Sequence, residues 1–156
     1  MMMRIWRNSG STQRGAVLVE MALVTPILLA MMLATAEITR AFVDHNTLTK
    51  AVRNGARYVA TNALQGTTGV VAIGGVLTTQ TQNLVVYGNI AGIGAPVLPG
   101  LTAADITVTD IGGTNIRVSA AHTISGILGP VLRSFSGGPD ISMVHNLEAT
   151  VTMRAL

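Results

Sequence analysis

Residues 16–36 form an almost unbroken run of apolar residues. This run follows a polar, basic segment at residues 1–15. Its one charged residue is Glu20, and Pro26 lies at its middle. At about 1.5 Å of rise per residue, a helix over this run spans about 31 Å, the hydrocarbon thickness of a bilayer. The run therefore predicts a transmembrane helix, kinked at Pro26 because proline removes a backbone hydrogen bond.

Apolar residues continue beyond this run at the three- and four-residue spacing of a helix, with charged residues between them. Within residues 37–61 these positions are Ala41, Leu48, Ala51, Val52, Ala56 and Val59. The periodicity predicts an amphipathic stalk that continues the first helix, so that a single helix covers residues 16–61. Gly55 interrupts the pattern and weakens the helix by about 1 kcal/mol relative to alanine.

Apolar and polar residues alternate one by one, as in a β-strand, only in the last third of the chain. Residues 106–110 and 115–120 alternate on either side of Gly112 and Gly113, which predicts a β-hairpin. Residues 147–153 alternate again, with Leu147, Ala149, Val151 and Met153 on one face. These three strands predict a small antiparallel sheet whose apolar face packs against the stalk helix.

The remaining segments give weaker patterns. Residues 83–87 read as a short strand, residues 124–135 as a broken helix or loop, and the rest of 62–104 as Gly- and Thr-rich loop. The expected fold is therefore α+β and lollipop-shaped. It has a basic leader at residues 1–15, a transmembrane and stalk helix at 16–61, and a Gly/Thr-rich, β-rich head at 62–156.

Charge adds an orientation to this picture. The net charge is +3, and Arg4, Arg7 and Arg14 account for all of it, because acids and bases balance from residue 16 onward. Basic residues flank membrane helices on the cytoplasmic side, so we expect a cytoplasmic N-terminus and a head on the opposite side of the membrane. No basic face is interleaved with aromatic residues, which argues against nucleic-acid binding.

The composition offers no arrangement typical of catalysis or metal binding. Charged residues make up 11% of the chain and cysteine is absent, whereas soluble domains carry about 25% charge. His45, His122 and His145 have no companions at metal-ligand spacing and are expected in loops or on the surface. No glycine-rich stretch ends in Lys-Ser or Lys-Thr, and no serine has a nucleophile-elbow context. We therefore expect neither an enzyme nor a cofactor.

Gly15 and Glu20 form the most informative pair. A carboxylate in a membrane segment costs about 2.5 kcal/mol or more at mid-bilayer and less near an interface, so Glu20 suggests a function. The segment RGAVLVE at residues 14–20 resembles the cleavage region of type IV prepilins. In that family a membrane peptidase cuts after the glycine, and glutamate is the fifth mature residue.

Two further segments narrow the resemblance. AVRNGARY at residues 51–58 and LEATVTMR at residues 147–154, taken with the first segment, resemble a TadE-like protein, a minor pseudopilin of tight-adherence (Flp-type) pili. The resemblance implies a pilin-like subunit that is cleaved between Gly15 and Ala16. It also implies that the subunit joins or primes a filament by contact with other pilin subunits, a prepilin peptidase, membrane lipid and an inner-membrane assembly platform.

Cleavage would give Glu20 a partner. It creates an α-amine on Ala16, and Glu20 of one subunit then neutralises the amine of its neighbour in the filament. The competing interpretation is an isolated Glu20 that reaches the headgroups or is protonated.

Two alternatives to a pilin remain open at this point. Residues 34–36 read Ala-Thr-Ala, which fits a signal-peptidase site and would release an exported binding protein beginning near Glu37. A chain that is never cut would instead be a single-pass membrane accessory protein.

Overall fold

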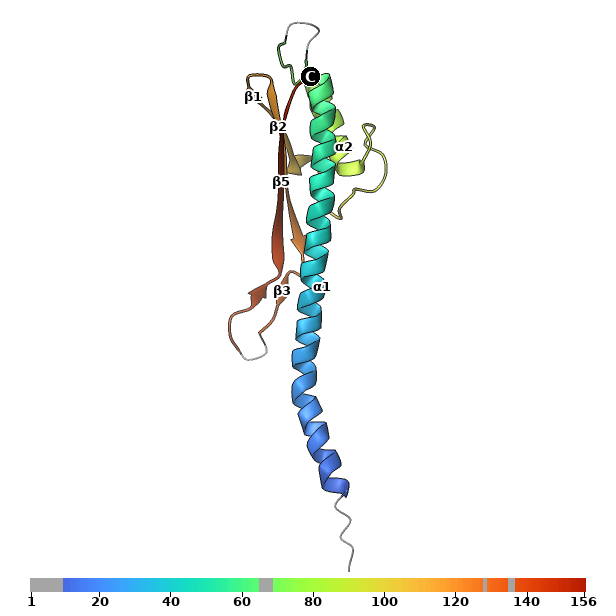
Figure 1. The fold of residues 1–156 in the computed structure, drawn as a ribbon, viewed down its shortest axis with the longest axis vertical. Helices are drawn as coiled ribbons and strands as arrows, with labels where there is room; N and C mark the ends of the chain where they lie inside the picture. The colour runs from blue at the N-terminus through green and yellow to red at the C-terminus, as the bar shows by residue number, and fades with distance from the viewer. Residues whose placement is uncertain (1–9, 65–68, 128, 135–136) are drawn as a thin grey trace, which may run out of the picture. The chain divides into compact units, whose positions relative to one another are not determined.

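The computed structural model describes residues 10–64, 69–127, 129–134 and 137–156, with the backbone alone for residues 10–14. Residues 1–9 of the predicted leader lie outside this range. The elements in chain order are α1 (Gly10–Asn62), α2 (Gly75–Tyr87), a 3-10 turn (Ala103–Asp105), β1 (Ile106–Gly112), β2 (Asn115–Ser125), β3 (Val131–Leu132), β4 (Ile141–Ser142) and β5 (Val144–Arg154) (Figure 1).

The predicted long helix is confirmed as α1, which is continuous through Pro26 and Gly55. It begins at Gly10, inside the predicted leader, rather than at residue 16. The chain divides into two compact units within this helix, Met1–Thr39 and Arg40–Leu156. The second half of α1 therefore belongs to the same unit as the sheet.

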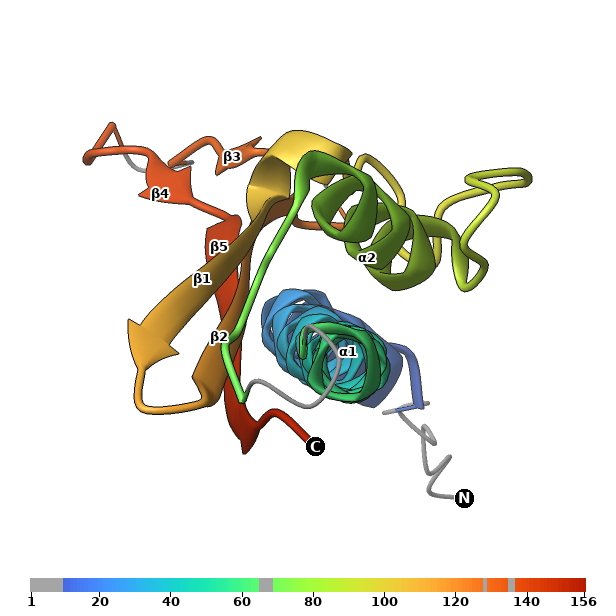
Figure 2. The same cartoon turned by 90° about the horizontal axis from the view of Figure 1, so that it is seen from above.

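The core of the second unit forms where three elements pack together. From α1 it takes Leu48, Val52 and Val59, all fully buried, at the predicted helical spacing. Seen end-on in Figure 2, this part of α1 has the sheet on one side and α2 on another. Each fully buried side chain of this size contributes about 1.5–3 kcal/mol. These contacts therefore hold the helix to the head.

The sheet confirms the predicted hairpin and final strand. Its order is β1-β2-β5 and both pairings are antiparallel, with Val118 of β2 opposite Val108 on one side and Val151 on the other. The turn between β1 and β2 places Gly113 and Thr114 at φ 61° and 67°, as a two-residue hairpin of primed type requires. The inner face packs in the core, and the outer face carries threonine and serine.

The structure corrects the prediction for residues 83–87, which form the end of helix α2 rather than a strand. The segment misleads because valine and tyrosine favour strands. Thr78, Thr79 and Thr81 each donate a hydroxyl hydrogen bond to the carbonyl four residues earlier, and Val85 is fully buried. Gly88 ends the helix with φ 73°.

Residues 124–135 are also different from the prediction of a broken helix or loop. Ile124 and Ser125 extend β2, and Val131–Leu132 form β3, which pairs with β4 in a separate two-stranded sheet. Phe135 lies outside the described residues. Glycine and proline at residues 126, 129 and 130 hid the short strand, because they break both helical and strand patterns.

Candidate assembly site: the exposed apolar helix and an arginine-lined pocket

The first half of α1 carries its apolar side chains outward. Every residue from 15 to 36 is exposed in the described chain, including Leu28 at 59% and Met31 at 64%. The helix is long and apolar enough to cross a membrane. An apolar helical surface of this length, with Glu20 as its one charged residue, is stable only in lipid or against other apolar helices. The unit therefore presents a surface that requires an external partner.

Three predicted site residues lie together on this surface, in the first turns of the helix. Gly15, Ala16 and Glu20 are all helical and exposed. Ala16 and Glu20 are four residues apart, so they lie on one face of α1. Pro26 lies within α1, about 9 Å farther along its axis than Glu20. Among the side chains that the structure describes, Glu20 has no ion-pair partner.

The AVRNGARY segment docks α2 onto α1. A Cβ atom on Gly55 would approach the Cγ2 of Val85 to 2.5 Å and that of Thr81 to 3.3 Å. Three residues farther along, the Tyr58 hydroxyl donates a hydrogen bond of 2.9 Å to Oε1 of Gln80. The glycine that weakens the isolated helix is therefore required where α2 crosses it.

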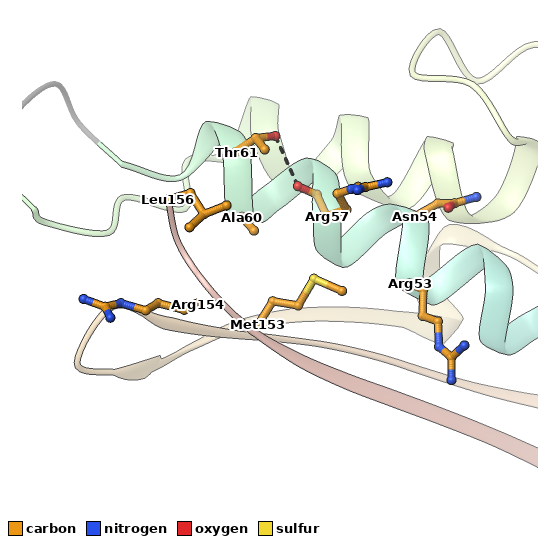
Figure 3. Close-up of a pocket in the computed structure, with 8 residues that line it drawn as sticks. All are labelled: Arg53, Asn54, Arg57, Ala60, Thr61, Met153, Arg154 and Leu156. Atoms are coloured by element: carbon orange, nitrogen blue, oxygen red, sulfur yellow. Dashed lines mark hydrogen bonds between the residues drawn. The ribbon is translucent and has the colours of Figure 1, made fainter.

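The other face of the same segment lines a pocket of about 380 Å³ with the end of β5. Its lining residues are Arg53, Asn54, Arg57, Ala60, Thr61, Met153, Arg154 and Leu156 (Figure 3). The two segments of the head that carry the sequence resemblance thus meet here. The sequence pattern does not predict this juxtaposition, because only the register between α1 and β5 brings Arg154 near Arg53.

The pocket is basic, with an apolar floor. Three of the eight lining side chains are arginines and none is a carboxylate. Within the described part of the chain, none of these arginines makes an ion pair. Their guanidinium groups point in different directions in Figure 3, so they do not converge on one small anion. The arrangement suits an acidic protein surface, which supplies several separated carboxylates.

One of the three histidines, His122, does not lie where the sequence predicts. His122 is buried, at 7% exposure, on the inner face of β2 rather than in a loop or on the surface. Its Nε2 lies 3.1 Å from the Pro99 carbonyl and its Nδ1 lies 3.4 Å from the Asp105 carboxylate. Asp105 also accepts a hydrogen bond from the Thr102 backbone. These contacts tie the loop before β1 to the sheet. Among the described residues, no three His, Cys, Asp or Glu side chains gather as a metal site would require.

Comparison with known proteins gives one partial similarity. No curated protein and no solved structure matches the chain. A family model does match, over the exposed half of α1 and most of its buried half, up to Arg57. Residues 15–57 of the chain are therefore similar to the family described as TadE-like protein.

Proposed function

We propose that this chain is a minor pilin, or pseudopilin, of a Tad/Flp-type pilus that is cleaved after Gly15 and joins or primes the filament. It acts by assembly and not by catalysis. The exposed apolar half of α1 carries the proposal, because it combines the TadE-like match with a glycine and a glutamate at prepilin spacing. Before assembly the helix is held in the inner membrane; afterwards it packs against the helices of other subunits.

Glu20 sets the stagger between subunits in this proposal. The new amine on Ala16 and the carboxylate of Glu20 are both costly in an apolar environment, and pairing them offsets that cost. The exposure of Glu20 on α1 leaves its carboxylate accessible to a neighbouring subunit.

The first test is the intact mass and N-terminal sequence of the chain purified from cell membranes. A mature chain that starts at Ala16 supports prepilin processing. A start near Glu37 would identify an exported domain, and an uncut chain would identify a membrane accessory protein; either contradicts the proposal. Leucine in place of Gly15 should block processing, whereas Gly74→Leu, in the head, should not.

Glu20→Gln tests the pairing separately from processing. We expect the variant to be cleaved normally but to give few or no filaments, because the Ala16 amine then lacks a counter-charge. Glu148→Gln is the matched control, since Glu148 is an exposed acid on the outer face of β5. Filament yield by electron microscopy is the measurement, and normal yield from Glu20→Gln would rule the pairing out.

The arginine-lined pocket is the proposed contact of the head with an acidic surface of another pilus component. Reversing the charge with Arg53→Glu and Arg57→Glu should reduce filament yield while leaving processing intact. Arg117→Glu is the control, because Arg117 is exposed on the outer face of β2, outside the pocket. Equal loss in both variants would show that the effect is general charge repulsion.

A further inference from the structure

The outer strand β1 leaves backbone groups unpaired along part of its free edge. The Ile106 amide donates to the Ala103 carbonyl, and the Ile106 carbonyl accepts a hydrogen bond of 3.2 Å from Nε2 of Gln82. Both backbone groups of Ile106 therefore point away from β2. Backbone direction alternates along an antiparallel strand, so those of Val108 and Asp110 point the same way. Within the described chain, the amides and carbonyls of these two residues make no hydrogen bond beyond the sheet.

The free edge of β5 is open in the same way. Val118 lies opposite Val108 in β1 and opposite Val151 in β5. The backbone groups of Val118 point away from Val108, so they bond to Val151. Thr150 and Thr152, on either side of Val151, therefore turn their amides and carbonyls toward the free edge. The described residues offer these groups no hydrogen-bond partner, and such an edge is a template for another strand.

The two open edges match when two copies of the chain lie side by side. β1 and β5 are both antiparallel to β2, so they are parallel to each other, and copies in one orientation present them in parallel. Hydrogen bonds in a parallel pair are slanted, so a residue bonds to the two residues that flank its neighbour. Val108 and Val151 share one level within the sheet. Placing Val108 beside Val151 of the next copy therefore pairs it with Thr150 and Thr152.

The side chains also agree with this register. On the outer face of the sheet it places Thr109 beside Thr152, and both are exposed and uncharged. On the inner face it places Asp110 beside Met153, which lines the arginine-lined pocket together with Arg53. Asp110 is exposed and is the one acid of β1. The register therefore brings a carboxylate to a pocket whose charged side chains are all basic, and this complementarity favours the pairing.

We propose that β1 of one copy of this chain adds in parallel to the free edge of β5 in a second copy and inserts Asp110 into the arginine-lined pocket. Asp110 is then the acidic partner of that pocket in the proposed function. The pairing rests on the proposed function in one respect, that neighbouring copies share one orientation. It joins two different surfaces of the same chain, so each added copy leaves a new edge open, as a filament requires.

Cysteine cross-linking between full-length chains in cell membranes tests this register. The chain has no cysteine, so each introduced cysteine is unique. Adjacent strands lie about 4.8 Å apart, within the Cα separation that a disulfide bridges. Co-expressed Thr109→Cys and Thr152→Cys chains with different tags should form heterodimers at severalfold higher yield than homodimers of either variant. Glu148→Cys replaces Thr152→Cys as the control, because it lies about 13 Å away along β5.

Asp110→Asn tests the charge and preserves the local structure of the hairpin. Its side-chain oxygen can still accept the hydrogen bond of 2.7 Å that Oδ1 of Asp110 accepts from the Gly112 amide. We expect this variant to lower the heterodimer yield severalfold. Asp140→Asn is the matched control, because Asp140 also accepts a backbone hydrogen bond, from Ser134, but lies outside β1 and the pocket.

The outcomes separate the edge pairing from the proposed function. Cleaved chains that form filaments without the heterodimer would contradict the pairing and leave the pilin proposal standing. Heterodimers from chains that keep their leader would support the pairing and contradict the pilin proposal. Thr109→Cys chains that cross-link equally well to one another would contradict the pairing, because they require contact between two β1 strands. Thr107→Cys with Thr150→Cys, the next pair in the same register, repeats the measurement if the first pair folds poorly.

Discussion

The two halves of α1 are both helical, but the surroundings of their apolar side chains differ. Residues 15–36 expose every side chain, whereas Leu48, Val52, Ala56 and Val59 in the second half are completely buried by their own chain. The first half carries a proline, which membrane helices tolerate better than soluble ones. The second half carries a glycine at the helix crossing. A single continuous helix thus belongs to two environments, one supplied by other molecules and one by the head.

The largest expected effect separates these environments directly. Leu48→Ala leaves a cavity in the core and should lower the free energy of unfolding by about 2–5 kcal/mol. Leu28→Ala removes the same atoms from an exposed position and should leave head stability unchanged. Hydrogen exchange of the β2 amides in the detergent-solubilised full chain measures both. Equal destabilisation would show that the first half also packs against the head.

A smaller effect is expected where α2 crosses α1. Gly55→Ala should destabilise the head by about 1–3 kcal/mol, because the added methyl group meets the stiff, buried side chain of Val85. Gly75→Ala is the control: nothing lies within 4 Å of its Cβ position, and alanine favours the helix. Urea unfolding followed by circular dichroism distinguishes the two. A gain in stability from Gly55→Ala would mean that α2 does not pack as closely as described.

The smallest expected effect concerns a hydroxyl in each half. Tyr58→Phe removes the hydrogen bond to Gln80 and should cost about 0.5–1.5 kcal/mol. Thr35→Val removes a bond from a hydroxyl to the Met31 carbonyl in the exposed half and should not change the unfolding of the head. The same unfolding measurement applies. A cost from Thr35→Val as large as that from Tyr58→Phe would weaken the distinction between the halves.

Short-range patterns were enough to predict α1, the β1–β2 hairpin and the final strand. The buried positions of the second half of α1 agree with its periodicity, because a helical face that packs on one surface repeats every three to four residues. The TadE-like segment was also recognisable from residues 14–20 and 51–58. Each of these features depends on residues that are close neighbours along the chain, so the local sequence is enough to predict it.

The residues could not reveal contacts between distant segments. Helix α2 is rich in threonine and valine, and it is helical because Val85 packs at Gly55 of α1. His122 looked like a surface histidine until the register of β2 placed it in the core, and Arg154 reached the pocket of Arg53 only through the alignment of β5 with α1.

The sequence by itself therefore determined the long helix, its apolar first half and the strands that alternate, since periodicity and length fix these locally. Only the tertiary structure decided that the second half of α1 belongs to the head, that Gly55 is a crossing point, and that the β3–β4 hairpin exposes its apolar residues. Packing free energy depends on which surfaces meet, and that is set by the fold rather than by any one segment.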